Sequence, residues 1–135
     1  APATGQTLPF APKWKAGAYF DVRHEVGGTN AIFAFGEIAW QDDSKFVPSF
    51  LTLRDSSGNP VENSVLAAAL TQKAYALVNA RIGYEFGAND WRLSAFIRNA
   101  FNKEYYVSGG TGSQVGYSAQ PGVPRTFGLE LSANF

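Results

Sequence analysis

Residues 124–135 read Pro-Arg-Thr-Phe-Gly-Leu-Glu-Leu-Ser-Ala-Asn-Phe and give the clearest structural signal in the sequence. From Arg125 onward, apolar residues alternate with polar or small ones. The apolar set is Phe127, Leu129, Leu131, Ala133 and Phe135, and the residues between them are Thr126, Gly128, Glu130, Ser132 and Asn134. Because side chains two residues apart lie on the same side of a β-strand, this pattern predicts a strand with one apolar and one polar face.

The same alternation occurs four more times upstream. In the first of these segments Trp14, Phe20 and Val22 fall on one face, whereas Asp21 and Arg23 fall on the other. The five strands are expected at about residues 13–26, 31–41, 74–86, 91–101 and 124–135. This pattern predicts an all-β fold, an antiparallel meander of five long strands.

The predicted connections alternate in length. Short turns are expected at 27–30 and 87–90, where Gly and Asn are concentrated. Long loops are expected at 42–73 and 102–123, with a short helix at 64–70 that has Ser64 as its N-cap. Strict alternation of short turns and long loops is typical of outer-membrane β-barrels.

Composition excludes several classes of function. The chain has 11 Lys+Arg, 11 Asp+Glu and no net charge, which gives no reason to expect a nucleic-acid partner. It has no Cys and one His, so disulfides, thiolate metal sites and His-cluster metal sites are not expected. No apolar run reaches the roughly 18–20 residues of a membrane helix. His24 lies near a turn without a Gly-x-Ser-x-Gly element, so we expect neither an enzyme nor a cofactor.

The two faces of the strands predict their surroundings. A Lys or Arg in the middle of a bilayer costs about 2–4 kcal/mol, so the charged face must point into a water-filled lumen. The apolar face must then contact lipid. Trp14, Trp40 and Trp91 lie near strand ends, where aromatic girdles form at lipid–water boundaries.

Several segments resemble the C-terminal end of TonB-dependent outer-membrane receptors. They are Pro9–Trp14, Tyr75–Tyr84, Trp91–Tyr106 with Arg-Asn-Ala-Phe-Asn-Lys-Glu-Tyr-Tyr at 98–106, and Pro121–Gly128, together with Phe135 at the end. The resemblance covers nearly the whole chain from about Leu8, and the motifs follow the order found in the family. Residues 1–135 are accordingly interpreted as the C-terminal part of such a barrel.

The resemblance implies a location in the outer membrane of a Gram-negative bacterium. Family members have a 22-stranded barrel around an N-terminal plug and import iron-siderophores, cobalamin or glycans, driven by the TonB complex. The implied partners are outer-membrane lipid, the plug and remaining strands, TonB through the N-terminal part, and the barrel assembly machinery. Phe127, Leu129, Leu131 and Phe135 resemble the assembly signal that this machinery binds.

Five strands cannot close a membrane barrel, because the smallest use eight. An open sheet in lipid leaves unpaired backbone groups at both edges, each costing several kcal/mol. We therefore expect this chain either to form part of a larger barrel or to associate through its edges with copies of itself or another chain. A third alternative is a soluble β-barrel that carries an apolar ligand on its aromatic face.

Four residues are candidates for contact with a substrate, namely Tyr105, Tyr106, Tyr117 and Arg98. The tyrosines offer contact area at low entropic cost, or else they belong to an aromatic girdle. Arg98 is expected on the lumen face, as are Arg81, Glu85 and Glu130. Such residues either guide a substrate or form a structural ladder of charge pairs across neighbouring strands.

Overall fold

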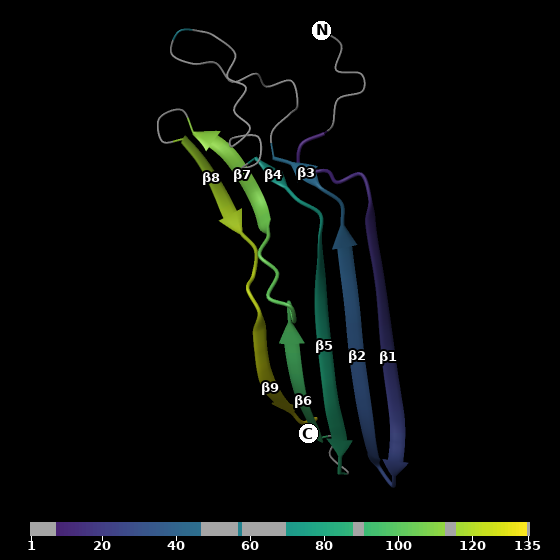
Figure 1. The fold of residues 1–135 in the computed structure, drawn as a ribbon. Helices are drawn as coiled ribbons and strands as arrows, with labels where there is room; N and C mark the ends of the chain where they lie inside the picture. The colour runs from purple at the N-terminus through teal and green to yellow at the C-terminus, as the bar shows by residue number, and fades with distance from the viewer. Residues whose placement is uncertain (1–7, 47–56, 58–69, 88–90, 113–115, 135) are drawn as a thin grey trace. The chain divides into compact units, whose positions relative to one another are not determined.

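The computed structural model describes residues 8–46, 57, 70–87, 91–112 and 116–134, and every regular element in these ranges is a β-strand (Figure 1). The helix predicted at 64–70 falls on residues outside the described ranges, except Leu70, which lies in a turn. Within the described ranges, no helix has the length and apolarity that a membrane crossing requires. The chain forms two compact units. The sheet unit comprises Ala16–Trp40, Ala76–Lys103 and Val123–Phe135, and the connection unit comprises Ala1–Lys15, Gln41–Tyr75 and Glu104–Gly122.

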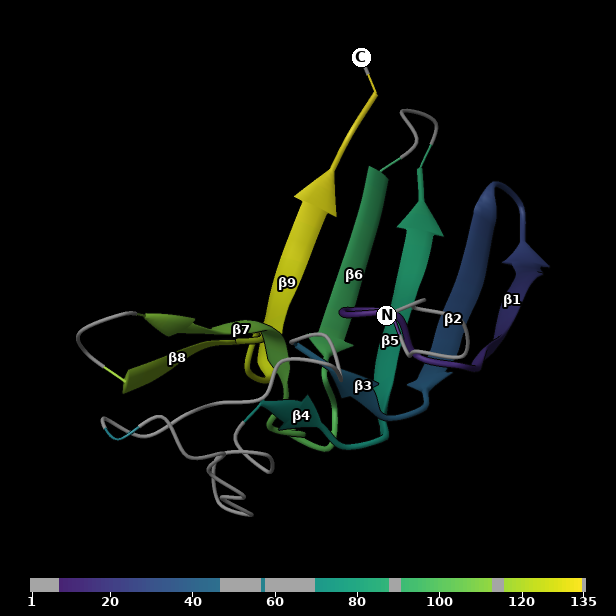
Figure 2. The same ribbon diagram turned by 90° about the horizontal axis from the view of Figure 1, so that it is seen from above.

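The sheet unit is built on a five-stranded antiparallel meander, as predicted (Figures 1 and 2). Its strands are β1 (Lys15–Gly27), β2 (Asn30–Gln41), β5 (Tyr75–Phe86), β6 (Trp91–Arg98) and β9 (Thr126–Ser132). The spatial order β1-β2-β5-β6-β9 is also the order in which these five strands occur along the chain. β1 and β9 are the two edges, and the described sheet is therefore open.

The strand register places the apolar residues of neighbouring strands side by side. Ile82 of β5 lies opposite Ala95 of β6, which in turn lies opposite Leu129 of β9. Three positions along, on the other face, Glu85 lies opposite Arg92. Since a one-residue slip would invert every side chain, this register gives the sheet one continuous apolar face and one continuous polar face.

The short connections join strands at one end of the sheet. Gly27 and Gly28 have φ of 126° and 58°, and Gly87 has φ of 78°. These values are accessible to glycine with little strain, which explains why each strand pair turns there. The connections between β2 and β5 and between β6 and β9 start from the opposite end of the sheet.

Two strands are shorter than their predicted ranges. β6 ends at Arg98 rather than at residue 101, because Asn99 has φ of 49° and leaves the extended conformation. β9 covers Thr126–Ser132 rather than 124–135, and Phe135 lies outside the described residues.

The connection unit corrects the prediction that 42–73 and 102–123 are loops. It contains the antiparallel pair β3 (Ser44–Lys45) and β4 (Thr71–Gln72), and the hairpin β7 (Tyr106–Gly112) and β8 (Gly116–Pro121). Two-residue strands are too short to show a period of two. The hairpin is rich in Gly and Ser, which resembles loop composition, although its strands pair along their length with one register shift between Tyr106 and Ser108.

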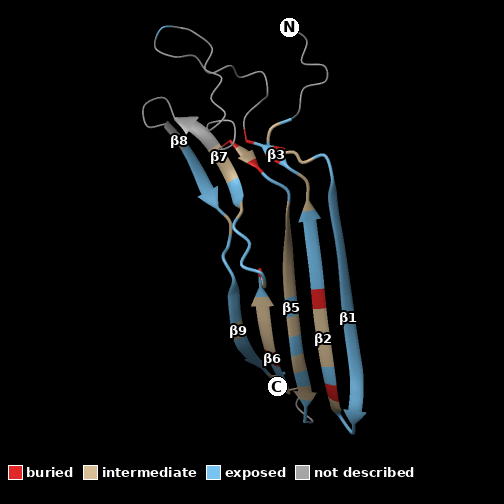
Figure 3. Ribbon diagram, viewed as in Figure 1, coloured by how far each residue is buried: buried red, intermediate tan, exposed pale blue. Residues whose placement is uncertain are grey.

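Burial differs between the two units (Figure 3). In the connection unit Phe46 and Leu70 are buried and form a small core. In the sheet, apolar side chains are strongly exposed: Ile82 is 64%, Phe127 75% and Leu129 77% accessible. Monomeric soluble proteins rarely expose contiguous apolar patches of this kind. The sheet therefore has a face that requires a non-aqueous environment or a partner.

Candidate functional site

The polar face of the sheet carries a carboxylate held between two arginines. Arg23 Nε donates a hydrogen bond to Glu85 Oε2 at 2.8 Å, and Arg92 Nη2 donates to the other oxygen, Oε1. Arg23 also reaches Glu25 at 3.3 Å. Glu85 is the least accessible of these side chains, at 16%. Alternation brings these residues to one face, so the charges of the two arginines and the two glutamates balance one another across β1, β5 and β6.

A second set of polar contacts continues this ladder toward the middle of the sheet. Asn79 Nδ2 donates to Glu37 Oε1 at 2.7 Å. Arg81 reaches both carboxylate oxygens of Glu130, at 3.4 and 3.5 Å. Together these contacts link β2 to β5 and β5 to β9, passing over β6 in the second case. This agrees with the structural-ladder interpretation of Arg81, Glu85 and Glu130.

Two phenylalanines lie on the polar face because glycines leave room for them. A Cβ atom at Gly83 would lie 2.3 Å from Phe33 Cζ, and one at Gly128 would lie 3.0 Å from Phe96 Cζ. Each ring therefore lies against the backbone of a neighbouring strand. Such aromatic–glycine pairs help to fix register in designed sheets.

Ser94 lies on this face between its strand partners Gly83 and Glu130. It is 2% accessible and its Oγ has no hydrogen-bond partner among the described residues. Buried hydroxyl groups in proteins usually form a hydrogen bond, either to another protein group or to an ordered water molecule.

Asn99 organises the end of the sheet opposite the short turns. It is 5% accessible. Its Nδ2 donates to the carbonyls of Lys103 and Val123 at 2.9 and 3.1 Å, and its Oδ1 accepts from Lys103 N at 2.8 Å. Its own N–H donates to Asn79 Oδ1 at 2.9 Å. The Asn99 side chain therefore satisfies backbone groups of Lys103 and Val123 at this end of the sheet.

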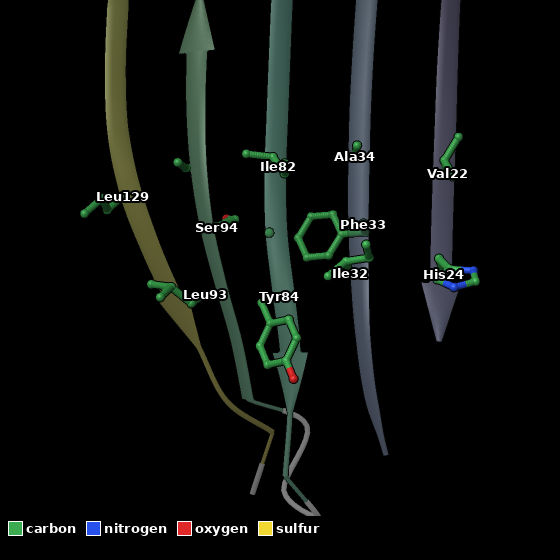
Figure 4. A pocket seen from close by; sticks show the side chains of 12 residues that line it. Val22, His24, Ile32, Phe33, Ala34, Ile82, Tyr84, Leu93, Ser94 and Leu129 are labelled. Atoms are coloured by element: carbon green, nitrogen blue, oxygen red, sulfur yellow. The ribbon is translucent and has the colours of Figure 1, made fainter. Parts of the chain in front are cut away.

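The apolar face carries a shallow hollow of about 440 Å³ (Figure 4). Side chains from all five strands line it, and almost all of its surface is apolar. Val22 and His24 come from β1, Ile82 from β5, Leu93 from β6 and Leu129 from β9. His24 thus lies on the apolar face close to the short turns.

The predicted girdle tryptophans lie at opposite ends of the strands. Trp40 is next to the last residue of β2, at the end where the longer connection begins, and Trp91 opens β6 next to a short turn. Trp91 stacks on Phe86 with centroids 6.5 Å apart, and Phe86 stacks on Tyr84 at 5.9 Å. Trp14 is exposed, and its carbonyl accepts a hydrogen bond from Asp42 N at 3.0 Å in the connection unit. The stacking of Trp91 with Phe86 and Tyr84 was not predicted. The sequence feature that indicates it is the presence of these three aromatic residues on either side of one short turn.

The four candidate substrate residues are divided between the units. Tyr105 stacks on Tyr75 with centroids 4.7 Å apart, and it covers Gly122, where a Cβ would lie 2.1 Å from its ring. Tyr106 opens β7 and is exposed, and its N–H donates to Gln72 Oε1 at 2.6 Å. These contacts make Tyr105 a packing residue at the base of the hairpin.

The other two candidates are placed differently. The backbone of Tyr117 lies in β8, opposite Thr111, while its side chain is outside what the structure describes. Arg98, the last residue of β6, is exposed on the polar face, with its guanidinium 5.5 Å from the centroid of Phe96. No group of three or more His, Cys, Asp or Glu side chains in the described ranges is arranged to hold a metal ion.

Three of the four residues predicted as an assembly signal lie on one strand, and the fourth, Phe135, lies outside the described residues. Phe127, Leu129 and Leu131 are all exposed on the apolar side of β9, opposite Ile97, Ala95 and Leu93 of β6. The other side of β9 is an edge of the described sheet. The three side chains are therefore displayed as a row beside an open strand edge.

Comparison with known proteins agrees with this arrangement. Residues 1–100 match the family model described as TonB dependent receptor-like, beta-barrel. The chain belongs to this family. No solved structure matches the chain. The TonB-dependent receptor barrel is an outer-membrane structure of Gram-negative bacteria, so the five-stranded meander is a segment of a receptor barrel wall.

Proposed function

We propose that this chain forms lipid-facing wall and outer connections of a receptor that imports a nutrient such as an iron-siderophore, cobalamin or a glycan. The observation that carries the proposal is the separation of the two faces. Paired charges line one side of the sheet, and exposed Ile, Leu and Phe side chains line the other. In an outer-membrane barrel these sides contact the aqueous lumen and the bilayer.

The open edges of the sheet support association with further strands. Backbone groups at the outer edges of β1 and β9 have no partner strand among the described residues. In lipid each unsatisfied group costs several kcal/mol, so both edges must be paired. The remaining strands of the receptor fit this requirement, with the plug and the TonB complex as further partners. Association with copies of the same chain is the alternative.

Uptake by whole cells tests the transport proposal. A strain lacking this chain should lose uptake of one labelled nutrient among a ferric siderophore, cobalamin and a maltodextrin. A strain without functional TonB should lose uptake of the same nutrient. Uptake of all three at the parental rate in the deletion strain would contradict the proposal and favour a structural role.

We also propose that Phe127, Leu129, Leu131 and Phe135 form the signal bound by the barrel assembly machinery. The exposed row on β9 supports this role for the first three. Leu129→Ser should lower the amount of heat-modifiable, folded protein in the outer membrane several-fold. Thr126→Ser, on the polar side of the same strand, serves as the matched control and should have no effect. Equal levels for both variants would contradict the proposal.

A further inference from the structure

The polar face carries two stacks of the same composition, each consisting of an arginine, a phenylalanine and a glycine. In the first, the guanidinium of Arg92 lies 5.0 Å from the centroid of Phe33, whose ring covers Gly83. In the second, Arg98 lies 5.5 Å from Phe96, whose ring covers Gly128. The second ring also has Arg81 at 5.7 Å from its centroid. Both stacks present a guanidinium to the same side of the sheet.

The stacks differ in how their charge is balanced. Arg92 is bound to Glu85, which Arg23 also contacts. Arg98 forms no ion pair with any described residue. Over all five strands the basic and acidic residues of the polar face are equal in number, namely Lys15, Arg23, Arg81, Arg92 and Arg98 against Asp21, Glu25, Glu37, Glu85 and Glu130. Because Arg81 already contacts Glu130, Arg98 is the guanidinium beside Phe96 that no described carboxylate contacts.

We propose that Arg98 is an anion-binding residue on the lumen wall that selects solutes bearing carboxylate or phosphate groups. This inference rests on the proposed function, because it requires the polar face to line a water-filled lumen. Arg98 ends β6 at the end of the sheet opposite the short turns. In outer-membrane barrels that end faces the outside, so an incoming solute meets Arg98 early.

The stack prepares Arg98 for this role. The planar guanidinium has five N–H donors in a rigid fork that matches a carboxylate or phosphate, and it stacks well on aromatic faces. Resting on Phe96 restricts its rotamers before any ligand binds, which lowers the entropic cost of binding. Gly128 gives the ring room, because a Cβ atom there would lie 3.0 Å from Phe96 Cζ and 3.1 Å from Cε1, a tight contact.

The register offers a matched pair of positions that test the proposal. Thr126 lies opposite Arg98, and Ser132 lies opposite Arg92, both on β9. The chain contains no cysteine. Thr126→Cys and Ser132→Cys therefore each introduce a single thiol beside one of the two stacks. The rate of modification by an anionic and by a cationic methanethiosulfonate of similar size is then measured for the receptor in outer-membrane vesicles.

The expected result is a several-fold preference for the anionic reagent at position 126 and a much smaller one at 132. Arg98→Gln should abolish the preference at 126, whereas Arg92→Gln should leave it unchanged. Millimolar citrate should slow modification at 126 by a neutral reagent at least threefold and have no effect at 132. Equal rates for both reagents at 126, or no protection by citrate, would overturn the inference.

The same assay separates this inference from the proposed function. If both polar-face thiols are unreactive while a Leu129→Cys thiol reacts readily, the face assignment fails and both proposals fall. If both thiols react without charge preference, only the anion site is wrong. Binding of radiolabelled citrate provides a measurement without introduced thiols, and Arg98→Gln should weaken it at least fivefold. An unchanged affinity in Arg98→Gln would overturn the inference.

Discussion

On the polar face of the sheet, charged groups are paired across strands and aromatic rings lie against glycines, whereas on the apolar face aliphatic and aromatic side chains extend into open space. Glu85 binds two arginines on one side, while Leu129 is 77% accessible on the other. Both faces share one backbone, so the difference arises only from alternation. It shows that the apolar face is not covered by any described residue of the chain, so the stability of the sheet depends on what surrounds that face.

The largest expected effect comes from placing a charge on the wrong face. Val22 and Asp21 are neighbours in the middle of β1 and point to opposite faces. Val22→Lys should destabilise the folded receptor by about 2–4 kcal/mol, because it places an ammonium group in lipid. Asp21→Lys is the matched control and should change stability by about 0.5 kcal/mol or less. Urea unfolding in lipid vesicles measures the free energy of unfolding of both variants. Similar losses of stability would contradict the assignment of one face to lipid and the other to water.

Asn99 is a buried polar exception at the end of the sheet. Asn99→Ala should cost about 2–3 kcal/mol, because the hydrogen bonds from the Asn99 side chain to Lys103 and Val123 are lost and alanine must adopt a positive φ. Asn102→Ala is the control, since Asn102 has a similar φ of 50° and its side chain accepts one bond, from Arg125 N. The same unfolding assay should show a smaller loss for Asn102→Ala. Equal losses would mean that backbone strain alone accounts for the effect.

Glycine-to-alanine substitutions on the two faces should differ in their cost to stability. At Gly83 a Cβ would meet the Phe33 ring and, at 2.7 Å, the carbonyl oxygen of Leu93, which cannot move away. At Gly36 the three nearest atoms would all belong to the ring of Phe20, 2.4 Å away at the closest, and that side chain is exposed on the apolar face. Gly83→Ala should therefore cost about 1–3 kcal/mol, and Gly36→Ala clearly less. A larger loss for Gly36→Ala would contradict this account of the polar face.

The smallest effect is expected within the charge ladder. Glu85→Gln removes the carboxylate that Arg23 and Arg92 share, so their repulsion is no longer compensated. Because both arginines are about half exposed, solvent screens much of this loss. The temperature at which the receptor unfolds on heat-modification gels should fall slightly. Glu25→Gln, which removes one exposed partner of Arg23, should change it less; the reverse order would count against a ladder centred on Glu85.

The sheet could be predicted from sequence because one pattern determines both strand and face. Phe127, Leu129 and Leu131 alternate with polar or small residues along β9. In the observed register they lie on the same face as Leu93 of β6 and Ile82 of β5. The glycine turns could be predicted equally well, because glycine readily adopts the positive φ that Gly27 and Gly28 have in the structure. Local rules alone were sufficient for these features.

The connection unit and the finer contacts could not be predicted in the same way. β3 and β4 are two residues each, and their pairing depends on contacts such as the bond from Phe46 N to the Leu70 carbonyl. The packing of Tyr105 on Tyr75 and Gly122 joins positions distant in sequence. Such contacts join residues that are distant in sequence, so they produce no periodic pattern from which they could be predicted.

The apolar face of the sheet is expected to contact lipid and the polar face to contact water. Nitroxide labels at Ile82 and Leu129, and at Asp21 and Ser132, distinguish the two faces by their collision rates with oxygen and with a water-soluble nickel chelate. We expect collisions with oxygen to dominate at the first two positions and collisions with the nickel chelate at the second two. Dominance of the nickel chelate at Ile82 and Leu129, with shielding of Asp21 and Ser132, would contradict this assignment of the faces.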